Sequence, residues 1–149
     1  MDPKFAAIIA DLSWERPKPL QEEARKAILL NLDQWDLSLL CLAGDKSCWK
    51  NEAQILKSTG YPRILPVLPR ILEWYMDVNW PGFSDITELL STVPSNELIP
   101  TLETVALKAL KENDGMWIFG LTFLVRELKI RRDQLSLESA RKILFKSNV

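Results

Sequence analysis

The sequence predicts an all-α protein of stacked antiparallel helix pairs, in the form of a short HEAT-like superhelix. Apolar residues recur at the spacing of amphipathic helices, and one such stripe contains Ile99, Leu102, Ala106 and Leu110. Only 5 glycines occur in the 149 residues, whereas prolines and capping residues divide the chain into helix-sized segments. A weak internal repeat of about 35 residues is typical of stacked helix pairs.

The first half of the chain is expected to hold five helices. Prolines at positions 17 and 19 prevent a helix from continuing. Asp33 or Asp36 can cap a helix start. Gly44 and Gly60 suit the left-handed residue that ends a helix. Three prolines between positions 62 and 69 leave the start of the fifth helix ambiguous, because proline fits only the first turn. The expected helices are residues 3–12, 20–32, 33 or 36 to 43, 47–58 and 66–76.

The second half is expected to hold four helices. Asn79 is expected to cap a helix that has Pro81 in its first turn and ends near residue 92. The next helix should run from about residue 94 to 112. Asp114 can cap the following one, which is apolar on most sides and should therefore sit centrally. A last helix is expected to start at Ser136.

Length and composition favour a single domain over residues 1–149. Hydrophobic residues make up 47% and charged residues 26% of the chain, which is typical of a globular protein. The longest apolar run, residues 116–125, is too short to span a bilayer, and the first residues do not resemble a secretion signal. We therefore expect a cytoplasmic protein without a membrane partner.

The residue types exclude several kinds of active site. The sequence contains no histidine, which removes Ser-His and Cys-His catalysis and the commonest metal ligand. Cys41 and Cys48 lack the spacing of a zinc or redox motif and are expected to be buried free thiols. Phosphate-binding glycine loops and nucleophile elbows do not occur either. We expect no catalytic residue, metal or cofactor.

The segment at residues 72–81 reads LEWYMDVNWP, and Asp114 and Trp117 later repeat the spacing of Asp77 and Trp80. It resembles the signature of domain of unknown function 5071, a small, mostly bacterial helical family that shares L-E-W, two residues and D-x-N-W-P. The resemblance covers residues 62–128. Family members commonly continue Pro-Val-Ala where this chain has Pro-Gly-Phe. The resemblance implies a helical fold and transfers no catalytic role, because the family's activity is unassigned.

This resemblance divides the expected single domain into three parts. Residues 1–60 form N-terminal helices that resemble no known family. Residues 61–130 form the family-like helix pairs, and residues 131–149 form a C-terminal capping helix.

One candidate site is a group of carboxylates. Glu73 and Asp77 lie four residues apart and would share a helix face, and Asp85 could approach them from the next helix. Close carboxylates could serve a hydrolase or nuclease as acid and base, or hold a divalent cation. The favoured alternative is that Asp77 caps a helix start while the others are solvated.

Other candidate binding residues are aromatic or basic. Trp14 lies beside prolines and could belong to a binding surface, whereas Trp80, next to Asn79, is expected to pack between helices. Residues 126–149 carry 7 Lys and Arg against 3 Asp and Glu, with Arg131 and Arg132 in a predicted turn. Such a cluster could bind nucleic acid, but a polar outer face on a terminal helix is the favoured interpretation.

The function that these observations favour is a non-catalytic protein-protein interaction module, of which an immunity-type protein is one form. Stacked helix pairs build extended grooves, and the sequence offers no catalytic constellation. A carboxylate-dependent enzyme around Glu73, Asp77 and Asp85 and nucleic-acid binding through the basic C-terminal third stay open as alternatives. The expected partner is another protein, and the sequence does not determine the oligomeric state.

Overall fold

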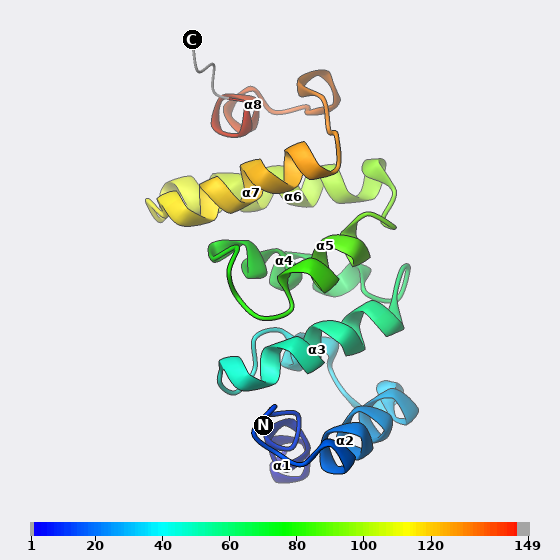
Figure 1. The fold of residues 1–149 in the computed structure, drawn as a ribbon. Coiled ribbons are helices and arrows are strands. Elements are labelled where there is room, and N and C mark those ends of the chain that lie inside the picture. The colour runs from blue at the N-terminus through cyan, green and yellow to red at the C-terminus, as the bar shows by residue number, and fades with distance from the viewer. Residues whose placement is uncertain (1, 146–149) are drawn as a thin grey trace.

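The computed structural model describes residues 2–145 of the chain (Figure 1). Within these residues it contains α-helices and short 3₁₀ turns and no strand, which confirms the all-α prediction. The helices stack from the N-terminal end to the C-terminal end (Figure 1). The helices are α1 (Pro3–Ala10), α2 (Lys18–Leu30), α3 (Lys46–Thr59), α4 (Leu68–Ile71), α5 (Phe83–Leu90), α6 (Ser95–Lys111), α7 (Gly115–Glu127) and α8 (Glu138–Leu144).

Where an aspartate directly precedes an α-helix, its carboxylate caps the first turn. The carboxylate of Asp45 accepts the N–H of Ser47 at the start of α3, and that of Asp114 accepts the N–H of Trp117 at the start of α7. The predicted start at Asp114 is therefore confirmed. None of the helices in the described residues is long and apolar enough to cross a membrane.

The predicted helix over residues 33 or 36 to 43 is wrong. The segment instead forms two 3₁₀ turns, Leu32–Gln34 and Leu37–Leu40. The backbone then leaves helical geometry, since Leu42 has a φ of 57°. Ala43 is held by contacts from α3, because its N–H donates to Glu52 at 2.8 Å and its carbonyl accepts the indole N–H of Trp49 at 3.2 Å.

Residues 65–76 also depart from the predicted regular helix. They form a 3₁₀ turn (Leu65–Val67), the short α4 and a second 3₁₀ turn (Leu72–Met76), because Pro66 and Pro69 lack the N–H groups that a continuous helix needs.

The next helix starts at Phe83 rather than in a turn that contains Pro81. Gly82 precedes it with a φ of 87°, and a Cβ there would lie 2.5 Å from the Cβ of Ala53. This close approach positions α5 against α3.

The centre of the structure is the contact between α7 and residues 72–76. Trp117 is 1% exposed, and its indole N–H donates to the Leu72 carbonyl at 3.1 Å. Gly120 lies directly against this backbone, since a Cβ there would lie 1.9 Å from the Tyr75 carbonyl oxygen. The other side of α7 does not enter the core, so its predicted central position holds for one face only.

The last helix is attached to α6 through a buried carboxylate. Glu103 is 3% exposed, and its two carboxylate oxygens accept the backbone N–H groups of Ser136 and Leu137 at 3.2 and 2.6 Å. It therefore caps the N-terminus of α8 from a different helix. At the far end of α6, Leu110 was expected to face the core but is 51% exposed, because the buried stripe ends at Ala109.

We predict that Gly120→Ala lowers the free energy of unfolding by about 3 kcal/mol, because the methyl group would force α7 away from the Tyr75 carbonyl. Gly115→Ala is the matched control, since a Cβ at Gly115 meets nothing within 4 Å. Chemical denaturation of both variants measures the difference. Equal stability of the two variants would contradict the close packing of α7.

Candidate functional site

The signature residue Glu73 belongs to a structural contact. Its carboxylate pairs with the guanidinium of Arg70 at 2.5 Å, and Arg70 also donates to the carbonyl of Cys41 at 2.9 Å. Glu73 therefore orients an arginine that holds the loop before α3.

The other two predicted carboxylates have separate partners. Asp77 accepts the backbone N–H of Asn79 at 2.8 Å within the turn before α5, so it closes this turn and does not cap a helix start as predicted. Asp85 lies 3.6 Å from the ammonium of Lys50 and 3.5 Å from that of Lys57, so it faces α3. Over residues 2–145 the structure brings together no group of three acidic, cysteine or histidine side chains that could hold a metal ion.

The aromatic residues of the signature also pack or tie the backbone. Trp74 is fully buried and donates its indole N–H to the carbonyl of Pro81 at 2.9 Å. Trp80 is half-buried and makes an edge contact with Trp49, with ring centroids 5.0 Å apart. Asn79 is exposed. The packing expected of Trp80 is therefore observed.

A buried carboxyl group that sequence analysis missed lies on α3. Glu52 is 0% exposed; one oxygen accepts the N–H of Ala43, and the other has no hydrogen-bond partner in the described part of the chain. Burial raises the pKa of Glu52 to about 9, with a further contribution from the negative charge of Asp45. Glu52 is therefore protonated at neutral pH. Its neighbours in the sequence, Asn51 and Ala53, offer no signal of this burial.

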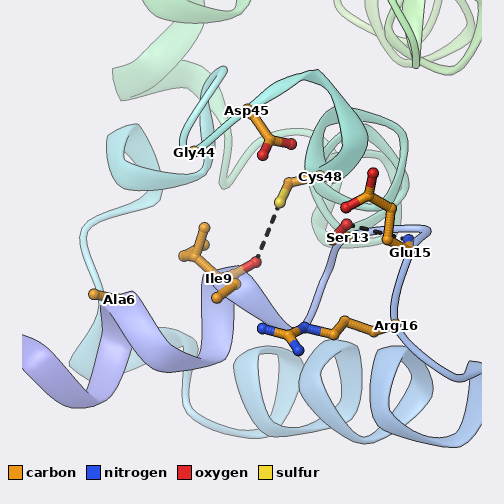
Figure 2. A pocket seen from close by; sticks show the side chains of 9 residues that line it. Ala6, Ile9, Ser13, Glu15, Arg16, Gly44, Asp45 and Cys48 are labelled. Atoms are coloured by element: carbon orange, nitrogen blue, oxygen red, sulfur yellow. Dashed lines mark hydrogen bonds between the residues drawn. The ribbon is translucent and has the colours of Figure 1, made fainter.

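A cleft of about 600 Å³ lies between α1, the following turn and the start of α3 (Figure 2). Its polar groups bond within the protein: the Cys48 thiol donates to the Ile9 carbonyl at 3.4 Å, and the Ser13 hydroxyl lies 2.6 Å from that of Ser47. Burial raises the pKa of Cys48, so this thiol is not an activated nucleophile. The lining residues are Ala6, Ile9, Ala10, Ser13, Glu15, Arg16, Gly44, Asp45 and Cys48.

Trp14 lies beside this cleft without lining it. Its neighbours Ser13 and Glu15 are lining residues. Its backbone N–H donates to the Ser47 carbonyl at 3.0 Å, while its side chain is 54% exposed. The backbone is therefore anchored and the indole is open to contact, so a binding role for Trp14 stays a prediction.

The predicted basic residues are partly neutralised. Arg131 pairs with Asp133 at 3.0 Å, and Arg132 lies 3.6 Å from Glu138. Arg141 also pairs with Glu138, at 2.7 Å. Lys146, which belongs to the same basic run, lies outside the described residues. These exposed pairs contribute little to stability but lower the net charge of the turn.

Helix α7 exposes large apolar side chains, although its composition predicted a central position. Met116 is 62% and Phe119 is 64% exposed. Beside Phe119 a groove of about 410 Å³ runs between α7 and α8, with Thr122 and Arg126 as its polar lining. The apolar lining consists of Ile118, Phe119, Val125, Ile143, Leu144 and Phe145. We call these lining residues the α7–α8 face.

The sequence model of domain of unknown function 5071 matches residues 41–148. The chain belongs to this family. The match is longer than the region of the sequence resemblance and includes α3 through α8. No curated protein and no solved structure matches the chain.

The family match separates the α7–α8 groove from the cleft in Figure 2. All residues of the α7–α8 face lie within the part that matches domain of unknown function 5071, whereas α1 and the turn after it, which form two walls of the cleft in Figure 2, precede that part. A function that belongs to the family domain itself is therefore better sought at the α7–α8 face.

We predict that Glu52→Gln stabilises the protein at alkaline pH. The folded state keeps the proton up to about pH 9, whereas the unfolded chain releases it near the ordinary value of 4.5, so the free energy of unfolding falls as pH rises between these values. Glutamine cannot ionise, so the variant should lose this decline of about 1.4 kcal/mol per pH unit and gain on the order of 4 kcal/mol relative to the wild type between pH 5 and pH 8. Urea unfolding at pH 5, 6.5 and 8 measures the free energy of unfolding of both proteins. A difference between them that does not depend on pH would contradict the buried neutral acid.

Proposed function

We propose that the chain is a non-catalytic protein-interaction module that binds another protein through the α7–α8 face. The observation that carries this proposal is the exposure of Phe119 beside an apolar groove, with Met116 also exposed on α7. Methionine and aromatic side chains are enriched at protein interfaces, and contiguous exposed apolar surface marks interaction sites. An immunity-type protein, which binds and blocks one partner, is one form that such a module takes.

The rigid support of this face favours recognition over catalysis. Trp117 and Gly120 fix α7 to the core on the side opposite Phe119, so the exposed side chains are presented without a large loss of backbone entropy on binding. The groove contains one charged residue, Arg126, and no acid or nucleophilic thiol among its lining residues. Glu73 and Asp85, the acids of the enzyme alternative, are each paired with basic side chains elsewhere.

We predict that Phe119→Ser weakens binding at least about tenfold, because an aromatic anchor would be removed from the interface. The side chain is 64% exposed, so the melting temperature should change little. A partner captured from lysate of the source cells and purified supplies the ligand, and calorimetry gives Kd for wild type and variant.

Trp14→Ala provides the matched control, since it removes an exposed aromatic from the α1–α2 end of the stack (Figure 1). If Phe119→Ser binds the partner as the wild type does and Trp14→Ala does not bind it, the interface lies at Trp14 instead. Sedimentation of the purified protein tests self-association. A dimer that dissociates in Phe119→Ser would assign the α7–α8 face to a second copy.

A further inference from the structure

We infer that the α7–α8 face recognises an acidic amphipathic segment of its protein partner, about two to three helical turns long. This inference rests on the proposed function and specifies the chemistry of the partner. It combines the apolar floor of the groove with the charges that surround it.

The size of the groove sets the length of the segment. The lining residues run from Ile118 to Arg126 on α7 and from Ile143 to Phe145 at the end of α8, so at 1.5 Å per residue the groove extends over roughly 12 Å along α7. A segment that lies between them can therefore place about two or three apolar side chains on the floor. Positions i, i+3 or i+4 and i+7 of an amphipathic helix meet this requirement.

The one charged side chain that lines the groove is positive. It is Arg126, which forms no ion pair with the residues that the structure describes, and the same holds for Lys142, next to the lining residue Ile143 on α8. The acids Asp133 and Glu138 are both paired with arginines.

Two neighbouring charged residues, Glu127 and Lys129, do not contribute to this charge, because they line a different hollow together with Leu90. Arg132 reaches the end of the groove, where its guanidinium donates to the Phe145 carbonyl at 3.5 Å. A segment with carboxylates beside its apolar residues would complement this arrangement.

An acidic protein segment fits these features better than nucleic acid does. Phosphate binding needs a basic surface but no apolar floor, whereas the groove is lined on both sides by aliphatic and aromatic side chains. The chain as a whole carries a formal net charge of −1, and its strongest basic turn is neutralised by Asp133 and Glu138.

The test is a selection of phage-displayed random 16-residue peptides on the full chain, followed by fluorescence anisotropy with the most enriched peptide. We expect enriched peptides with apolar residues at helical spacing and flanking Asp or Glu. Arg126→Glu should weaken their binding at least about tenfold, and Phe119→Ser should do the same. Lys26→Glu is the matched charge-reversal control, because Lys26 is an exposed residue of α2, and it should leave binding unchanged.

The outcomes separate this inference from the proposed function. The enriched peptides could instead be neutral or basic, with binding that Phe119→Ser abolishes and Arg126→Glu leaves unchanged. This result would overturn the acidic partner and leave the binding module intact. A selection without any Phe119-dependent peptide would overturn both. Binding of a DNA duplex that is lost in Arg126→Glu but retained in Phe119→Ser would assign the basic groups to nucleic acid instead.

Discussion

The packing of α7 against residues 72–76 is the contact on which the rest of the structure depends. Pro66 and Pro69 interrupt regular hydrogen bonding in the preceding turns, and residues 72–76 themselves form a 3₁₀ turn, so their carbonyls are open to donors from elsewhere. Trp117 supplies one such donor, and Gly120 allows the two backbones to approach. This single contact joins the irregular centre of the chain to its most apolar helix, and α5, α6 and α8 are arranged around it.

Tryptophan indoles perform the same task at three places, which accounts for three of the six tryptophans in the chain. Each lies in or beside an irregular segment and donates to a backbone carbonyl that a helix would otherwise satisfy. The pairs are Trp49 with Ala43, Trp74 with Pro81 and Trp117 with Leu72. The segment at residues 72–81 contains one of these donors, together with the Glu73 that orients Arg70. In this chain these residues hold the irregular backbone in place.

Sequence analysis predicted the structure well where a local signal decides it. Asp114 caps α7 as expected, since the cap needs only an acceptor beside the first N–H groups. It failed over residues 33–43 and 66–76, where prolines and contacts from other helices override helical periodicity. Glu52 was missed because its burial depends on a loop that folds back over α3. Asp85 was assigned to the wrong neighbours because the turn before α5 directs that helix towards α3, and spacing along the chain does not contain this information.

Some apolar side chains of α7 face the core and others are exposed, and helical periodicity alone did not distinguish the two groups. One side, which includes Trp117 and Gly120, is required by the core and is fully accounted for by its contacts. Phe119 points away from this side and Met116 lies at its edge; they are 64% and 62% exposed, so they contribute little burial to folding and lower solubility. Stability therefore gives little reason for these two side chains. The binding surface that we propose would give one, and because the core contacts hold α7 in place, such a surface would be ordered before a partner arrives.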